Sequence, residues 1–173
     1  MKFSKLLLML GLIYLGCGDP SGPAPDPEAQ AALIAKERQE ALEEIEAANR
    51  RITSLASEGK FEEASRHFTA DMVQMIAGQP PIQGREAWIA TQQQMASMGQ
   101  WDLELEVLDF EFMGDRAVER GRGVQTFVAN ESSPLPSMEQ TGDYLVLWVR
   151  TDEGWKIRWD YVVLETQGPG AGE

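Results

Sequence analysis

Cysteine and histidine are almost absent from this chain of 173 residues, which contains one of each. The single cysteine, Cys17, excludes an intrachain disulfide and a cysteine-based metal cluster. Basic residues are also scarce, because 15 Lys and Arg stand against 28 Asp and Glu, and the formal charge is −13. Nucleic-acid binding needs clustered basic side chains, so we expect no nucleic-acid partner.

Motifs for cofactors and metals are missing as well. The sequence has no glycine-rich phosphate loop and no nucleophile with a flanking base, and no set of carboxylates has the spacing of a calcium loop. We therefore expect no cofactor and no metal ion. The length and the 43% apolar content fit one globular domain with a further segment at an end.

The N-terminus has the pattern of an export signal. Lys2 and Lys5 precede the apolar run Leu6–Leu15, which is too short for a transmembrane helix, and a small residue then precedes Cys17. This pattern resembles the lipobox of bacterial lipoproteins, in which the signal is cut before a cysteine that receives acyl chains. The resemblance implies a signal peptide over residues 1–16 and a lipid anchor on Cys17. The alternative is a cleaved secretory signal followed by a free cysteine.

A tether and a tail are expected at the two ends of the mature chain. Residues 17–27 begin with the cysteine and continue as GDPSGPAPDP, the composition of an extended linker. Gly18 follows the cysteine where an Asp would favour the inner membrane, so the lipoprotein rule favours the outer membrane, with the domain facing the periplasm. The domain is expected over residues 28–166, and the glycine-rich residues 167–173 are predicted to be disordered.

Helical periodicity occupies the first half of the domain and strand alternation the second half. The predicted helices are 28–57, 61–68 and 85–98, and the predicted strands are 70–77, 101–113, 116–129 and two more within 141–165. Helices followed by long antiparallel strands indicate an α+β fold, in which a strongly curved sheet wraps round the N-terminal helices as a cone and leaves a pocket.

The stretch Thr141–Glu165 is predicted to be the central hairpin of the sheet. A four-residue loop pairs Val146 with Trp159, and a three-residue loop ending at Gly154 pairs Val146 with Asp160. The second register is favoured because glycine often supplies the positive φ of such a turn. It would place two aromatic side chains on the pocket side, Tyr144 and Trp148.

Alternation along the final strand divides its side chains between two faces. One face carries Lys156, Arg158, Asp160 and Val162. The other carries Trp155, Ile157, Trp159 and Tyr161. The second set predicts an aromatic patch on the outer face of the sheet, through which the domain could form a homodimer.

Six segments, in order, resemble the SnoaL-like branch of the nuclear transport factor 2-like superfamily, which includes ketosteroid isomerases and scytalone dehydratase. The resemblance covers Glu44 to Leu164. The segments are residues 46–49 with 59–64, 67–71, 80–87, 114–121, 141–144 and 154–160. The resemblance implies a cystatin-like cone in which the Asp160 face looks into the pocket.

Asp160 and His67 are the candidate catalytic residues. Desolvation in a pocket raises the pKa of a carboxylate and suits it to act as a general base, as in isomerases. Arg158, two residues away, favours the alternative of a structural ion pair that lowers the pKa of Asp160. His67 is the only side chain with an ordinary pKa near neutrality, and the alternative for it is a surface or capping role.

The remaining pocket candidates are inferred from strand faces and side-chain character. Glu119 shares a strand face with Ala117, Gly121 and Gly123, whose small size leaves space for a ligand, although plain packing is an equal alternative. The other candidates for ligand contact are Tyr144, Trp148, Arg158 and Met75, the last because a flexible thioether adapts to apolar ligands.

Three functions follow from these features. The favoured one is a membrane-tethered lipoprotein whose domain binds a small apolar or amphipathic ligand without chemistry. The second is an isomerase, dehydratase or cyclase with Asp160 as the base, helped by Tyr144 or His67. The third is a non-catalytic homodimerisation module that uses Trp155, Trp159 and Tyr161. The sequence does not identify the ligand.

Overall fold

The computed structural model describes residues 26–165. The predicted signal peptide, the predicted lipidation site Cys17, nearly all of the predicted tether and the predicted tail lie outside the described residues. Among the described residues, no helix is both long enough and apolar enough to cross a membrane.

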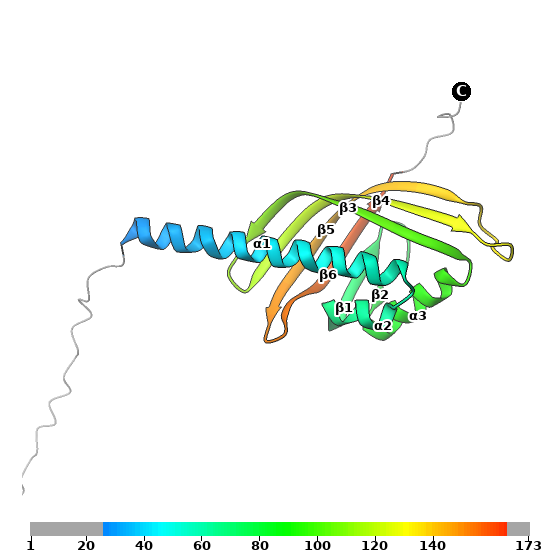
Figure 1. The fold of residues 1–173 in the computed structure, drawn as a ribbon, viewed down its shortest axis with the longest axis horizontal. Helices are drawn as coiled ribbons and strands as arrows, with labels where there is room; N and C mark the ends of the chain where they lie inside the picture. Colours follow the sequence, from blue (N-terminus) through cyan, green and yellow to red (C-terminus); the bar gives the residue numbers. More distant parts are fainter. Residues whose placement is uncertain (1–25, 166–173) are drawn as a thin grey trace, which may run out of the picture.

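The first helix, α1, runs from Pro27–Ser57. Asp26 caps its start by accepting a hydrogen bond from the backbone N–H of Glu28. Pro27 occupies the first helical position, where its missing N–H costs nothing and its fixed φ suits a helix. Gly59, at a φ of 75°, follows the end of α1, close to the predicted boundary at residue 57. Figure 1 shows the first half of α1 projecting beyond the sheet, and residues 27–40 are exposed.

Two shorter helices follow α1 (Figure 1). They are α2, Phe61–Ala64, which continues as a 3-10 turn over Ser65–His67, and α3, Arg85–Ala96. Helix α2 packs against α1, and α3 packs against α2. Trp88 of α3 is buried and makes edge-to-face contacts with Phe61 and Phe68, at 6.4 and 4.7 Å between ring centroids. This aromatic cluster fixes the shorter helices against the start of the sheet.

Six strands form one curved sheet in the order β2-β1-β6-β5-β4-β3. Their bounds are β1 Phe68–Ile76, β2 Ile82–Gln83, β3 Gly99–Phe112, β4 Arg116–Ala129, β5 Met138–Thr151 and β6 Gly154–Leu164. The pairing of β1 with β6 is parallel, and the other neighbouring pairs are antiparallel. The predicted α+β fold and the central position of the 141–165 hairpin are confirmed, while the short β2 was not predicted.

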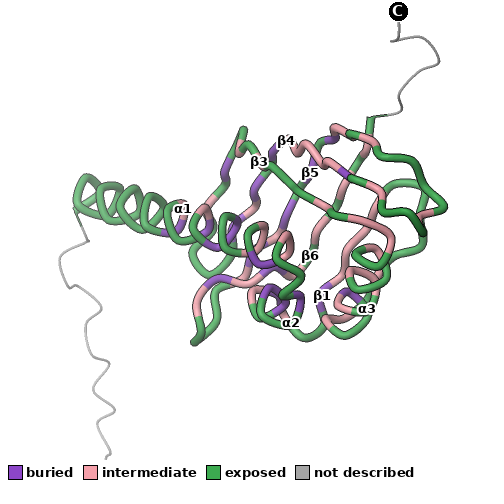
Figure 2. Tube along the Cα trace, turned by 45° about the vertical axis from the view of Figure 1, so that its right-hand side comes forward, coloured by how far each residue is buried: buried purple, intermediate pink, exposed green. Residues whose placement is uncertain are grey.

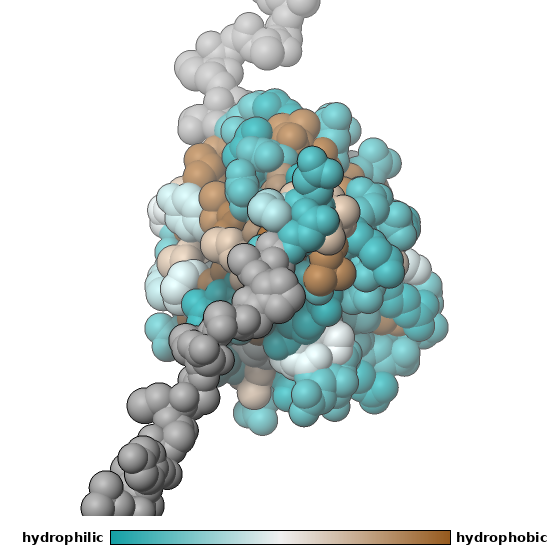
Figure 3. All heavy atoms as spheres, turned by 90° about the vertical axis from the view of Figure 1, so that its left-hand side faces the viewer, coloured by the Kyte–Doolittle hydropathy of each residue, from teal (hydrophilic) through white to brown (hydrophobic). Residues whose placement is uncertain are grey.

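The core lies between the inner face of this sheet and the second half of α1. Figure 2 shows buried segments along the strands and on the part of α1 that crosses them. The buried positions of α1 recur at helical spacing: Ala41, Ile45, Ala48, Asn49 and Leu55. Figure 3 views the end from which α1 projects, where hydrophilic side chains cover most of the surface.

A β-bulge at Arg158 sets the register of the central hairpin. Next to the turn, Thr151 pairs with Gly154 across a two-residue loop, and beyond the bulge Val146 pairs with Asp160. The predicted pairing of Val146 with Asp160 is confirmed, but the one-residue shift comes from the bulge and not from a three-residue loop.

The same bulge overturns the predicted faces of the final strand. Trp155 is only 5% exposed and packs in the core against Phe112, whereas Trp159 is 49% exposed and Tyr161 is 42% exposed on the outer face. The prediction that Trp155 shares an outer patch with Trp159 and Tyr161 is wrong, because strict alternation along a strand assumes that no residue is inserted.

Candidate functional site

A cavity of about 460 Å³ lies between the helices and the inner face of the sheet. Its apolar wall includes Phe61, Phe68, Trp88, Trp101, Val146 and Val162. Most of the exposed residues that line it lie where α1, α3 and β3 meet, among them Glu58, Gln100 and Asp102. We take this region as the mouth of the cavity.

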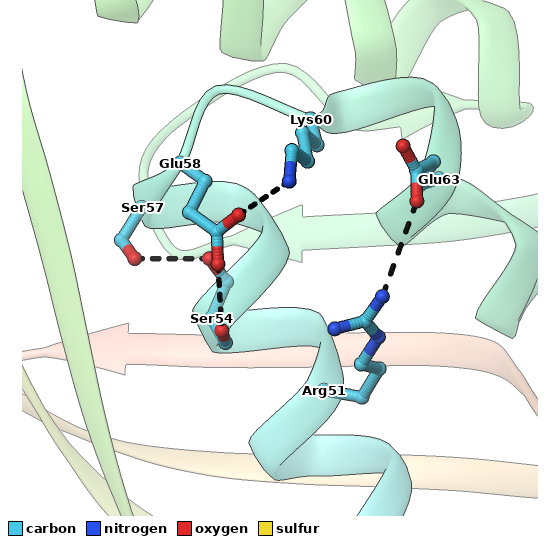
Figure 4. A network of polar contacts seen from close by, with 6 residues as sticks. All are labelled: Arg51, Ser54, Ser57, Glu58, Lys60 and Glu63. Atoms are coloured by element: carbon cyan, nitrogen blue, oxygen red, sulfur yellow. Dashed lines mark hydrogen bonds and ion pairs between the residues drawn. The ribbon is translucent and has the colours of Figure 1, made fainter.

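The end of α1 forms a polar network at this mouth (Figure 4). Glu58 accepts hydrogen bonds from Lys60, at 2.6 Å, and from Ser54, at 3.1 Å. The bond from Lys60 is the main reason that the pKa of Glu58 is lowered. Nearby, Arg51 pairs with Glu63 of α2 at 4.0 Å. These contacts hold the turn between α1 and α2 at the rim of the cavity.

Asp160 lies on the inner face of β6 and lines the cavity. Gln74 of the parallel neighbour β1 is its register partner and donates a hydrogen bond of 2.6 Å to its Oδ2. Burial raises the pKa of Asp160 to about 6, against the effect of the Gln74 bond, which lowers it. Protein atoms surround the carboxylate of Asp160. The residue as a whole is still partly exposed, because it faces the cavity.

Arg158 does not pair with Asp160. Its guanidinium forms an ion pair with Asp71 of β1, at 2.7 Å, and also donates to the carbonyl oxygen of Asp71. Because the bulge inserts Arg158 into the strand, the side chains of Arg158 and Asp160 do not point to the same face of the sheet. The predicted ion pair is therefore wrong, and within residues 26–165 Asp160 has no cationic partner.

Glu119 of β4 is fully buried, at 0% exposure, and lies behind the cavity wall. Its carboxylate accepts hydrogen bonds from Asn49 Nδ2, at 2.9 and 3.0 Å, from Tyr144 Oη, at 2.7 Å, and from Trp148 Nε1, at 3.0 Å. Burial raises the pKa of Glu119 and these three donors lower it. The carboxylate thus ties α1 to β4 and β5 without a cation.

Tyr144 of β5 occupies the space beside the small residues of β4. It pairs with Gly121, where a Cβ atom would overlap the Tyr144 ring. Burial, with the negative charge of Glu119, raises the pKa of Tyr144 above its ordinary value. The Tyr144 ring therefore fills the space beside Gly121. Of the three small residues on this face of β4, which are Ala117, Gly121 and Gly123, Gly123 alone lines the cavity.

The structure separates the other predicted site residues. Tyr144 lines the cavity, Trp148 is buried behind it, and neither Arg158 nor Met75 contributes to its lining. His67 lies in a second hollow, which also includes Glu44 and Trp155, and burial lowers the pKa of His67. The structure thus brings Asp160 and Tyr144 to one cavity and places His67 elsewhere.

Two polar residues of the site, Asn49 and Gln74, are absent from the predicted set. Asn49 follows Ile45 by four residues and precedes Ile52 by three, so its helical spacing marks a polar residue on the buried face of α1. Gln74 gives no comparable signal, because its role depends on the parallel pairing of β1 with β6. In residues 26–165, no three His, Cys, Asp or Glu side chains are grouped so as to hold a metal ion.

The comparisons with known proteins agree with this architecture. The model of the SnoaL-like domain family matches residues 37–159, and the chain belongs to this family. No curated protein matches the chain.

Solved structures show the same fold at low sequence identity. A nuclear transport factor 2-like protein with a cystatin-like fold from Novosphingobium aromaticivorans is 23% identical, with a TM-score of 0.64 over 84% of this chain and 94% of that chain. A ketosteroid isomerase-like protein from Erwinia carotovora is 17% identical, with a TM-score of 0.60 over 70% and 94%. A nuclear transport factor 2-like superfamily protein from Salmonella enterica is 14% identical, with a TM-score of 0.64 over 78% and 99%.

Proposed function

We propose that the SnoaL-like domain binds a small amphipathic ligand in the cavity between the helices and the sheet. One observation carries this proposal: apolar and aromatic side chains surround a cavity of about 460 Å³ whose wall also holds the hydrogen-bonded pair Asp160 and Gln74. Ligand sites are typically pockets of this size, with mostly apolar walls and a few polar groups that orient the ligand.

Filling the cavity tests this proposal. Gly123 lines the cavity, and a Cβ atom there would meet nothing closer than 3.4 Å. Gly123→Leu should therefore place its side chain in the cavity, and Gly123→Ala is the matched control for the backbone. We expect Gly123→Leu to abolish binding of naphthalen-2-ylmethanol in a calorimetric titration and Gly123→Ala to retain it. Equal binding to both variants would place the ligand elsewhere.

Acid–base catalysis is a second candidate, favoured by the pKa of about 6 at Asp160. A carboxylate with a pKa near neutrality can remove a proton from carbon next to a carbonyl group. Tyr144 lines the same cavity, whereas His67 takes no part in this proposal because it lies in the other hollow. The likeness to a ketosteroid isomerase-like protein supports the fold needed for such chemistry.

Proton exchange would reveal this activity without knowledge of the substrate. We expect the protein to accelerate deuterium incorporation next to the carbonyl of 2-tetralone, as followed by NMR. Asp160→Asn should remove the acceleration while retaining binding of the ketone. Deuterium exchange at the uncatalysed rate in the presence of the wild-type protein would exclude this catalysis, and ligand binding would be the proposed function of the cavity.

We also propose that the domain is anchored in the cell envelope through Cys17 and forms a homodimer through its outer sheet face. The anchor rests on the sequence pattern at Gly16 and Cys17, and Cys17→Ser should abolish metabolic labelling with palmitate. The dimer rests on a patch of four exposed apolar residues on the adjacent strands β5 and β6: Leu145, Trp159, Tyr161 and Val163.

A further inference from the structure

We propose that the ligand of this cavity is a cationic amphiphile, an apolar body that carries an ammonium group. The inference rests on the proposed function, because it names the class of ligand for the same cavity.

The charge of the lining has one sign. No Lys, Arg or His belongs to the described residues that line the cavity, whereas three carboxylates do: Glu58 and Asp102 near the mouth and Asp160 farther in. Lys60 pairs with Glu58 at the rim, and Arg158 is held by Asp71. The carboxylate of Asp160 therefore has no neutralising charge, and a ligand ammonium would supply one.

The buried carboxylate of Glu119 determines how the hydrogen-bonding atoms of Asn49 and Tyr144 are oriented. A carboxylate only accepts hydrogen bonds, so the NH₂ group of Asn49 faces Glu119 and its amide oxygen points the other way. Asn49 is 9% exposed and lines the cavity, and none of the described residues donates to its Oδ1. The hydroxyl proton of Tyr144 is likewise directed to Glu119, which leaves the cavity only the lone pairs of that oxygen.

Asp160 adds a further free acceptor. Gln74 occupies Oδ2, and no described residue donates to Oδ1. Asn49, Tyr144 and Asp160 therefore present acceptors, which match the three N–H donors of an ammonium group. A charged donor forms stronger hydrogen bonds with a carboxylate than a hydroxyl does. Tyr144 and Trp101 also belong to the wall, and the face of an aromatic ring attracts a cation rather than an anion.

The rest of the lining does not reverse this preference. The amides of Gln92, Gln125 and Gln140 offer both donors and acceptors, so they suit either charge. A ligand carboxylate or phosphate would face Asp160 with no Lys, Arg or His in the wall to compensate. The cavity should therefore reject an anionic head group on the same apolar body.

Three probes with the same naphthalene body test the inference: naphthalen-2-ylmethanamine, naphthalen-2-ylmethanol and 2-naphthoate. Their affinities would be measured by calorimetry at pH 7.5 with the full chain carrying Cys17→Ser. We expect the amine to bind at least tenfold more tightly than the alcohol and the acid to bind more weakly than either. Asp160→Asn should reduce the affinity for the amine at least tenfold and change that for the alcohol less than threefold.

Glu106→Gln is the control for general attraction to an acidic protein, since Glu106 is exposed and does not line the cavity. It should leave the preference for the amine unchanged. An acid or alcohol that binds as tightly as the amine would overturn the inference while leaving the cavity as a binding site. An equal loss in Glu106→Gln and Asp160→Asn would also overturn it. Failure of all three probes to bind would overturn the proposed function itself, and the inference with it.

Discussion

Arg158 forms its ion pair with Asp71, at 2.7 Å, and leaves Asp160, two residues later on the same strand, beside an uncharged partner. The two side chains would share a face of an unbroken strand, but the bulge at Arg158 separates them. As a result, burial dominates the pKa of Asp160, and the nearest polar partner is the amide of Gln74.

Removing the guanidinium should therefore leave the titration of Asp160 unchanged. We expect Arg158→Met to keep the pKa of Asp160 at about 6, and Gln74→Met to raise it, because the bond from Gln74 favours the ionised form. The measurement is the carboxyl carbon shift in NMR as a function of pH. A clear rise in Arg158→Met would show that the guanidinium does stabilise the ionised Asp160.

The raised pKa of Asp160 predicts that this carboxylate destabilises the folded domain as the pH rises. Between the ordinary value of 3.8 and about 6, the folded state binds more protons than the unfolded state, so this contribution to stability falls with increasing pH. The penalty is complete above about pH 7 and amounts to roughly 3 kcal/mol at most, at about 1.4 kcal/mol for each pKa unit.

Asp160→Asn removes this penalty while retaining the shape of the side chain. The stability of Asp160→Asn relative to wild type should therefore increase between pH 4.5 and pH 7.5, as measured by urea unfolding at both values. Glu119, whose raised pKa has the same sign, is present in both proteins, so the difference between them reports on Asp160 and on its electrostatic interaction with Glu119. A difference that is independent of pH would mean that Asp160 titrates normally in the folded state.

The order of the elements other than the short β2 was predictable because each of them has a local signal. The 3.6-residue period over α1, the alternation along β4 and glycine at the turns act within a few residues of one another. The bulge at Arg158 has no such signal, because it arises where β6 fits between β5 and β1, and both pairings shift near this position. One inserted residue was enough to reverse the predicted positions of Trp155 and Arg158.

The candidate site was predictable in part. Tyr144 was placed on the pocket side from the register of one hairpin and Asp160 from the resemblance to the SnoaL-like family, and both line the cavity. Trp148, which the same register placed there, is buried behind it. The bonds from Asn49 and Trp148 to Glu119 join α1, β4 and β5, so they depend on tertiary packing. Glu119 was left open between binding and packing, and its position behind the wall gives it a structural role.

Replacing Glu119 should show how far the hydrogen bonds from its three donor residues outweigh the cost of burying a carboxylate. Glu119→Leu leaves the donors of Asn49, Tyr144 and Trp148 without an acceptor, and each buried unpaired donor costs about 1–3 kcal/mol. We expect a loss of at least about 3 kcal/mol in urea unfolding.

Glu119→Gln is the matched variant, because its amide oxygen still accepts and its NH₂ group can donate to a Tyr144 hydroxyl that has turned round. Its loss should be about 1 kcal/mol or less. Wild-type stability in Glu119→Leu would instead mean that the desolvation of the carboxylate cancels its hydrogen bonds.

Gly121 should be intolerant of a side chain, and Gly123, two residues along β4, should not. A Cβ atom at Gly121 would overlap the ring of Tyr144 and the carbonyl oxygen of Glu106, whereas one at Gly123 makes ordinary contacts. We expect Gly121→Ala to cost about 2 kcal/mol or more in thermal or urea unfolding, and Gly123→Ala less than about 1 kcal/mol. Equal losses of stability in the two variants would show that the Tyr144 ring does not pack against Gly121 in this way.

The outer face of the central strands should be the contact between two copies of the domain. Leu145 and Tyr161 are direct cross-strand partners there, and Trp159 and Val163 extend the same exposed patch. Trp159→Glu places a charge in this contact, where losing water is costly without a partner. We expect the wild-type sedimentation coefficient to be that of a dimer and Trp159→Glu to be a monomer. Leu33→Glu, on the projecting turns of α1, is the control that should stay dimeric. A monomeric wild type would exclude the contact, and dissociation by Leu33→Glu alone would move it to α1.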